Sequence, residues 1–140
     1  MNKNEELMNF IARINESDKI DFCDEFLNDA AEIFKKKNSV VKELFPLLNK
    51  QIDAILDLTP YRLSRFNGNE ILKGMPFECY SLHLHRKKFN IRILGTYVGN
   101  VFYMLVMFEE KSGKKATDYT KPKEKARRRA ERLCLQKKKD

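Results

Sequence analysis

Apolar side chains recur every three or four positions through the first 60 residues, which is the spacing of helices. Three such stretches cover residues 5–14, 18–37 and 39–56. Ser39 is a predicted N-cap for the third helix, and the Thr-Pro pair at 59–60 ends it. We therefore expect the first part of the chain, residues 1–60, to be helical.

From residue 75 the period of the apolar positions changes from 3.6 to 2, which predicts strands. Two runs, at 80–84 and 89–94, alternate between apolar and polar positions. A third, at 101–108, is apolar on both faces, as in a central strand. Gly99 and Asn100 predict a tight turn between the second and third runs.

The alternation also predicts how the strands pair. The first hairpin needs an even loop around residues 86–89, because an odd loop would turn its apolar set to the wrong side of the sheet. An even loop centred there places His83 opposite Arg92. With two turn residues at 99–100, the expected pairs of the second hairpin are Ile91 with Phe108 and Ile93 with Val106.

This register gives the sheet one apolar face and one mixed face. We expect the helices to cover the apolar face and to leave the mixed face open to a ligand. The apolar face is predicted to hold Tyr80, Leu82, Leu84, Phe89, Ile91, Ile93, Phe102, Met104, Val106 and Phe108. The mixed face is predicted to hold His83, His85, Arg92, Tyr103 and Met107.

A final helix is expected after Thr120, with Pro122 near its first turn. Its predicted packing stripe is narrow and consists of Ala126, Ala130, Leu133 and Cys134. The predicted fold is α+β: one domain, 1–140, whose N-terminal helices pack on a small antiparallel β-sheet formed within 70–140 and followed by a basic C-terminal helix.

Charge is distributed unevenly along the chain. The formal net charge is +8, but residues 1–34 carry −6 and residues 111–140 carry +9. A basic cluster of this kind favours a polyanionic partner, and nucleic acid is the one we expect.

Several other classes are disfavoured by composition. No apolar run approaches the ~18 residues of a membrane span, so no membrane association is expected, and the N-terminus lacks the pattern of a signal peptide. Three widely spaced cysteines without a CxxC motif predict neither disulfides nor a zinc site. A reducing cytoplasm is the expected location.

Two histidines carry the candidate chemistry. His83 and His85 could ligate a metal together, but no third ligand has a fitting spacing, and we expect neither a metal nor another cofactor. An imidazole beside the Arg92 guanidinium loses proton affinity, which favours a neutral general base. The alternatives are a half-exposed strand histidine without a role, and an Arg92 that forms a salt bridge with Glu109 or Glu110.

RNA cleavage needs little more than such a base. The 2′-hydroxyl attacks the adjacent phosphate, so the protein must take a proton, give one and stabilise extra negative charge. Arg92, with Lys111 and neighbouring lysines, could surround that charge. The predicted RNA contacts are His85, Lys87, Lys88, Lys114, Lys115, Arg127, Arg128 and Arg129.

At these residues the chain resembles the RelE/HigB family of toxins. The resemblance spans residues 72–133 and rests on the strands at 80–84 and 91–94, the segment Phe-Glu-Glu-Lys-Ser-Gly-Lys-Lys at 108–115 and the basic, Ala-containing helix. It implies an mRNA interferase that cuts message on the ribosome and is held inactive by a cognate antitoxin.

The resemblance assigns roles residue by residue. Arg92 matches the family's strand arginine, and Lys111 and Lys114 match two lysines of its basic loop. His83 stands where the family usually has Arg, and Glu110 where it usually has Lys. The implied catalytic set is therefore His83, Arg92 and Lys111.

Two other classes remain open. Three antiparallel strands followed by Gly-Lys-Lys and a basic helix also end a double-stranded-RNA-binding domain, although that fold carries one helix before its strands. A phage-derived protein that keeps the toxin fold only as an interaction scaffold is the third class. RNA cleavage separates the toxin from both.

Overall fold

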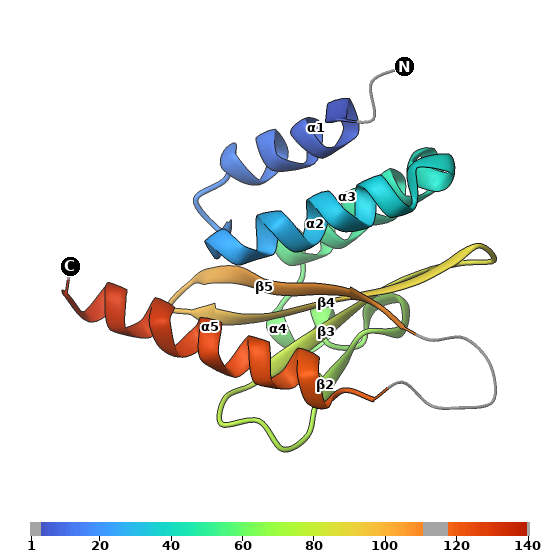
Figure 1. Ribbon diagram of the computed structural model, residues 1–140. Helices are drawn as coiled ribbons and strands as arrows, with labels where there is room; N and C mark the ends of the chain where they lie inside the picture. Colours follow the sequence, from blue (N-terminus) through green and yellow to red (C-terminus); the bar gives the residue numbers. More distant parts are fainter. Residues whose placement is uncertain (1–3, 111–117, 140) are drawn as a thin grey trace.

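A five-stranded sheet lies between two helical layers in the computed structural model of the protein, which describes residues 4–110 and 118–139. Helices α1, α2 and α3 lie on one side of the sheet and α5 on the other, as the ribbon in Figure 1 shows. The helices are α1 (Asn4–Asn15), α2 (Asp24–Lys36), α3 (Val41–Asp57), α4 (Pro60–Leu63) and α5 (Thr120–Lys139), with short 3-10 turns η1 (Asn38–Val40) and η2 (Phe66–Gly68). This arrangement confirms the predicted α+β class.

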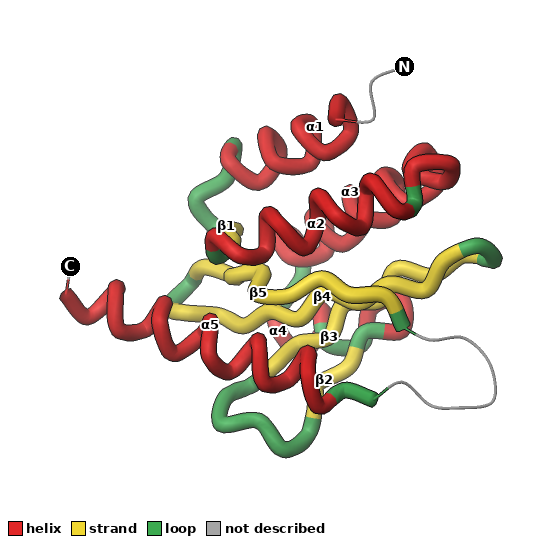
Figure 2. Tube along the Cα trace, in the orientation of Figure 1, coloured by secondary structure: helices red, strands yellow, loops and turns green. Residues whose placement is uncertain are grey.

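The strands form one mixed sheet in the order β1-β5-β4-β3-β2 (Figure 2). Three long antiparallel strands make its centre: β3 (Cys79–Arg86), β4 (Phe89–Val98) and β5 (Val101–Glu109). Two three-residue strands make its edges: β1 (Ile20–Phe22), which runs parallel to β5, and β2 (Glu70–Leu72), which runs antiparallel to β3. The predicted sheet lacked both edge strands, and its purely antiparallel character is wrong at β1.

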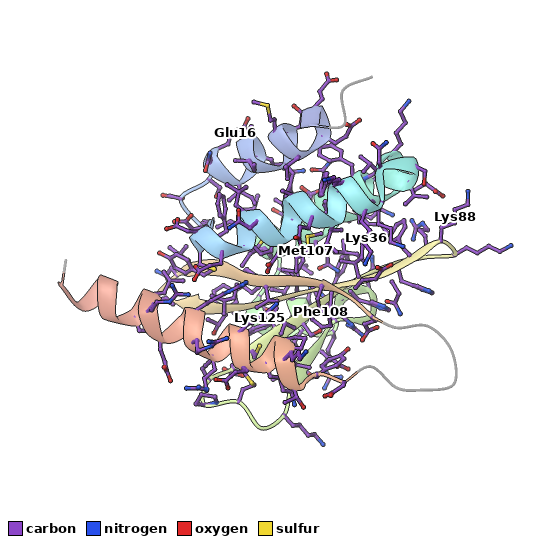
Figure 3. All side chains as sticks on the ribbon, in the orientation of Figure 1. Glu16, Lys36, Lys88, Met107, Phe108 and Lys125 are labelled. Carbon is purple, nitrogen blue, oxygen red and sulfur yellow. The ribbon has the colours of Figure 1, made fainter. Side chains whose placement is uncertain are left out.

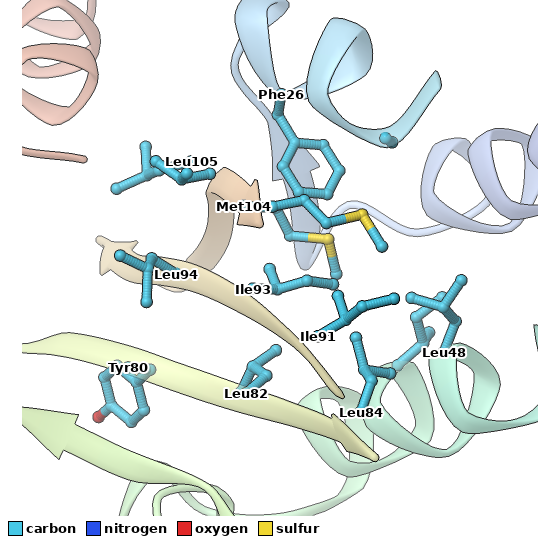
Figure 4. Close-up of a cluster of buried hydrophobic side chains, with 14 of the residues drawn as sticks. Phe26, Leu48, Tyr80, Leu82, Leu84, Ile91, Ile93, Leu94, Met104 and Leu105 are labelled. Carbon is cyan, nitrogen blue, oxygen red and sulfur yellow. The ribbon is translucent and has the colours of Figure 1, made fainter. Parts of the chain in front are cut away.

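The core lies between the sheet and the layer formed by α2 and α3. Figure 4 shows Phe26 of α2 and Leu48 of α3 against the strand residues Ile91, Ile93 and Met104. All five side chains are almost fully buried. α1 packs on both helices from outside. The ring of Phe10 lies 6.3 Å from that of Phe26 and 6.2 Å from that of Phe34, both on α2, and Arg13 donates to Asn49 of α3 at 2.9 Å.

The first hairpin has the predicted register. Arg86 pairs with Phe89 across a two-residue turn, and His83 pairs with Arg92. The even loop is therefore confirmed, and so is the cross-strand pair that depends on it.

The second hairpin keeps the predicted register only near its turn. Gly95 pairs with Met104, but Leu94 pairs with Val106, so Leu105 is an extra residue on β5. Beyond this bulge every partner is shifted by one position. The expected pairs of Ile91 with Phe108 and Ile93 with Val106 are wrong, because Ile91 pairs with Glu109 and Ile93 with Met107.

The bulge also exchanges the faces of the β5 residues that follow it, since paired side chains point to the same side of a sheet. Val106 and Phe108 therefore share the face of Leu94 and Arg92, and Met107 shares that of Ile93. The mixed face is not left open either. α5 covers part of it with Ala126, Ala130 and Leu133, which are buried, while Cys134 is exposed and does not belong to the packing stripe.

The N-terminal helices also differ from the expected boundaries. Residues 20–22 form β1 rather than the start of a helix, and α2 begins only at Asp24. Ser39 lies inside η1, and the N-cap residue of α3 is Val40, so the predicted N-cap is wrong. A three-residue edge strand is too short to interrupt the helical periodicity of the surrounding sequence, which is why the pattern did not reveal it.

The outer edge of β5 is held by an ion pair where β1 ends. Asp29 of α2 accepts a hydrogen bond from the Met107 backbone N–H at 3.2 Å and pairs with Arg129 of α5 at 2.7 Å. Arg129 also donates to the Leu105 carbonyl at 2.7 Å. Two side chains thus replace the missing part of an edge strand and join both helical layers to the sheet.

We predict that the Asp29→Ala substitution lowers the free energy of unfolding by about 1–3 kcal/mol, because it leaves the partly buried Arg129 guanidinium without its carboxylate and the Met107 N–H without its acceptor. Urea denaturation measures this loss. The control is Arg127→Ala on the same helix, whose side chain pairs with Glu124 and Glu131 of α5. A midpoint for Asp29→Ala equal to that of the control would contradict the role assigned to the ion pair.

Candidate functional site

His83 and Arg92 lie near the end of the sheet that carries the β3–β4 hairpin. The tip of that hairpin projects from the body of the protein, with Lys88 extended into solvent (Figure 3). His83 is half-buried on β3, and Arg92, its partner on β4, is buried. Both face the side of the sheet that α5 covers only in part.

The His83 ring is held on several sides. Its Nε2 lies 2.6 Å from Oδ1 of Asn90, and its ring stacks on that of His85 at 5.4 Å with an angle of 5°. Gly68 of η2 approaches the other ring nitrogen, Nδ1, so closely that a Cβ at that position would lie 2.8 Å from it. The imidazole therefore has one defined orientation.

Burial is the main reason that the pKa of His83 is lowered from its ordinary value of 6.5. The hydrogen bond to Asn90 opposes this shift, and the Arg92 guanidinium adds to it. The direction agrees with the prediction, but desolvation contributes more than the arginine that the sequence singled out. His83 is thus a neutral imidazole near pH 7.

Arg92 is engaged by the protein itself. Its Nη1 donates to the Gly68 carbonyl at 2.9 Å and to the Ser81 carbonyl at 3.4 Å. Its Nε lies 3.5 Å from a carboxylate oxygen of Glu110 and makes no hydrogen bond within the described part of the chain. The salt-bridge alternative for Arg92 is thereby realised with Glu110, and the guanidinium is not free to meet a ligand in this arrangement.

Glu110 is held in turn by Tyr119. The tyrosine hydroxyl donates to the Glu110 carboxylate, and its ring packs edge-on against Phe108 at 5.5 Å. Tyr119 directly precedes α5, so this contact brings the start of the basic helix next to Arg92. The predicted loop residues Lys111, Lys114 and Lys115 lie outside the described residues.

Three predicted RNA contacts lie on the same hairpin as His83. His85, Lys87 and Lys88 are all exposed, the two lysines in the turn of the first hairpin. Their positions follow directly from the confirmed register of that hairpin.

The three predicted arginines of α5 differ in their surroundings. Arg127 pairs with Glu124 and Glu131 of its own helix. Arg129 forms the partly buried ion pair with Asp29. Arg128 is exposed, with Glu124 at 3.8 Å as its nearest carboxylate. Charge alone predicted all three as RNA contacts, but of the three only Arg128 is exposed to solvent.

Arg128 was predicted as an RNA contact, but it belongs to a cationic stripe on α5 that the sequence prediction did not recognise. It consists of exposed side chains spaced four, three and four residues apart, which places them on one side of a helix. Helical periodicity applied to the charged residues would have found it. We call this set the α5 stripe: Lys121, Lys125, Arg128 and Arg132, the last of which also contacts Glu25 of α2.

A cleft of about 670 Å³ opens beside the stripe, between α2, the outer edge of β5 and α5. Lys125 and Lys36 contribute to its walls, but so do Asp29, Glu32 and Glu109. His83 and Arg92 do not line it. Its carboxylates make it a poor site for a phosphate chain.

Comparison of the chain with protein-family models, with curated proteins and with solved structures found no match in any of the three. Among the described helices, none combines the length and the apolar character needed to cross a membrane. Over residues 4–110 and 118–139, no three His, Cys, Asp or Glu side chains gather as metal ligands would.

We predict that His83 titrates with a midpoint below 6.5 in an NMR pH titration, and that Asn90→Ala lowers the midpoint further, because the Asn90 oxygen stabilises the protonated ring. With its folded pKa below the unfolded value, His83 favours unfolding when protonated, and stability falls as the pH drops below about 6.5. A midpoint at or above the unfolded value would contradict the burial of this ring.

Proposed function

We propose that the protein is an RNA-binding, metal-independent endoribonuclease of the kind that the RelE/HigB-like pattern implies. The observation that carries the proposal is the half-buried His83 imidazole, neutral near pH 7 and paired across the strands with Arg92. In line with that pattern, the proposed substrate is mRNA, cut on the ribosome, and the proposed regulator is a cognate antitoxin protein.

The proposed reaction needs one base and no metal. His83 takes the proton of a ribose 2′-hydroxyl, and the 2′-oxygen forms a bond to the adjacent phosphorus. The bond from phosphorus to the 5′-oxygen breaks, and that oxygen takes a proton from water. The products are a 2′,3′-cyclic phosphate and a 5′-hydroxyl, and the imidazolium returns its proton to solvent.

The α5 stripe supports RNA as the ligand. Its four cations lie along one side of the helix. The first of them, Lys121, lies two residues after Tyr119, whose hydroxyl donates to Glu110, the carboxylate beside Arg92. Evenly spaced cations of this kind neutralise successive phosphates and release their counterions. An RNA strand that follows the stripe is thereby directed toward His83.

A second candidate is an RNA-binding protein without catalytic activity. It is favoured by the Glu110 carboxylate, which lies beside the Arg92 guanidinium where a scissile phosphate would need that charge. For the nuclease to work, an incoming phosphate must displace the Glu110 carboxylate from Arg92.

The first test measures cleavage of a mixed-sequence RNA by the purified protein, in EDTA without ribosomes and in magnesium buffer with ribosomes. We predict cleavage by the wild-type protein and a loss of about 10²–10⁴-fold in the rate at saturating RNA for His83→Gln, with the Kd for RNA nearly unchanged. Arg128→Gln on α5 is the control, because this exposed side chain lies outside the His83 pair, and it should weaken binding without slowing the saturated rate. Binding of RNA without any cutting by the wild-type protein would favour the second candidate.

The second test concerns the α5 stripe. We predict that replacing Lys121, Lys125 and Arg128 by Gln reduces the slope of log K against log salt by about 2 for single-stranded RNA, since each lost phosphate contact removes ~0.7. Arg127→Gln is the control, because Glu124 and Glu131 already neutralise that side chain. Fluorescence anisotropy with labelled poly(U) at several salt concentrations gives both slopes, and an unchanged slope for the triple variant would remove the stripe from the RNA site.

A further inference from the structure

The edge strand β2 ends before it reaches His83. The pair nearest to His83 joins Glu70, the first residue of β2, to Ser81, which lies two residues before His83 on β3. The backbone N–H and C=O of His83 nevertheless have partners on this outer side, and both partners are side chains. Asn69 Oδ1 accepts from the N–H at 2.8 Å, and Gln51 Nε2 donates to the C=O at 3.0 Å.

The two amides also bind each other. Gln51 donates to Asn69 at 2.8 Å, and Asn69 donates back to Gln51 at 2.9 Å and to the Leu63 carbonyl at 2.9 Å. Gln51 is 2% exposed and Asn69 is 7% exposed. Buried amides that use both their donors and their acceptors in this way are rigid, because any other orientation leaves a polar group unpaired.

This amide pair fixes the direction of the His83 side chain. Because both backbone groups of His83 point outward to the amides, the residue forms a non-hydrogen-bonded pair with Arg92, the arrangement in which cross-strand side chains come closest. The same short segment holds the second member of that pair, since the Gly68 carbonyl accepts from Arg92. Residues 68 and 69 thus position both His83 and Arg92.

The ring contacts then distinguish the two nitrogens of His83. Nε2 faces the acceptor oxygen of Asn90, so in the neutral ring this nitrogen carries the proton. Nδ1 keeps the lone pair and faces Gly68, which is exposed and has no side chain to cover it. The charged and titratable groups that face the ring are Arg92 and Glu110 from the β4 and β5 side and His85 from its own strand.

We infer that Nδ1 of His83 is the atom that takes the 2′-hydroxyl proton, that the absence of a side chain at Gly68 keeps it accessible, and that Gln51 and Asn69 are positioning residues for it. The inference rests on the proposed nuclease function. It assigns roles to three residues outside the catalytic set that the RelE/HigB-like pattern implied.

The decisive experiment compares two glycines with nearly the same positive φ. Gly68 has a φ of +83° and Gly74 a φ of +78°, so alanine is similarly strained at both positions. A Cβ at Gly74 would meet nothing within 4 Å, whereas one at Gly68 would lie 2.8 Å from Nδ1. We expect Gly68→Ala to reduce the cleavage rate at saturating RNA at least thirtyfold, and Gly74→Ala to leave it within twofold of the wild type.

A second measurement needs no activity. Long-range ¹H–¹⁵N NMR spectra of the histidine ring should show the proton on Nε2 of His83 in the wild-type protein. Asn69→Ala should yield a mixture of the two tautomers and lower kcat more than it changes the Kd for RNA. If Asn69→Ala does not fold, the two glycine variants and the wild-type spectrum still decide the question.

The outcomes separate this inference from the proposed function. A wild-type protein that cuts no RNA overturns the nuclease function itself. A protein that cuts RNA but carries the His83 proton on Nδ1, or loses equal activity in Gly68→Ala and Gly74→Ala, overturns only the assignment of Nδ1.

Discussion

Two long strands of the sheet, β3 and β5, extend well past the three-residue strands that flank them, and their outer backbone groups must find partners. In this protein side chains supply the partners at both edges. Gln51 and Asn69 bind the backbone of His83 on β3, while Asp29 and Arg129 bind the backbone of Met107 and Leu105 on β5. Because these side chains come from α3, from the segment before β2, from α2 and from α5, completing the sheet edges also fixes the helices against the sheet.

Because Arg129 serves to complete a sheet edge, the basic residues of the C-terminal region do not all have the same role. α5 has a buried apolar side, an exposed cationic side and a side where Arg127 is neutralised by Glu124 and Glu131. Arg129, between the buried and the cationic sides, serves the architecture. The net charge of the region therefore overstates the charge available to a polyanion, and the spacing of the exposed cations is the more informative property.

The sequence predicted the parts of the site that depend on local rules. An even hairpin loop and the alternation of apolar positions were sufficient to place His83 opposite Arg92, because the two strands are joined by two residues. The bulge at Leu105 could not be predicted in the same way, since an extra apolar residue in a strand that is apolar on both faces does not change the sequence pattern. Val106, Phe108 and Met107 were assigned to the wrong faces for that reason.

The partners of His83 and Arg92 come from distant parts of the chain, and the local sequence pattern could not identify them. The role of Asn69 and Gln51 follows from the fact that β2 does not extend alongside His83. A three-residue strand gives too little alternation to be predicted from the sequence. Glu110 was named as one of two possible partners of Arg92, and charge alone could not choose between them. In contrast, the α5 stripe could have been predicted from the sequence, because its spacing is a local helical property.

The parallel pairing of β1 with β5 has a consequence for how the chain folds. It joins Ile20 to Phe102, and the Asp29–Arg129 pair beside it joins residues 100 positions apart. The β3–β4–β5 meander, by contrast, is closed by short turns, and such hairpins form in about 1–10 μs. Since long loops cost more entropy to close than short ones, the meander that holds His83 and Arg92 is expected to form early, and the attachment of β1 and α5 to its β5 side to complete folding late.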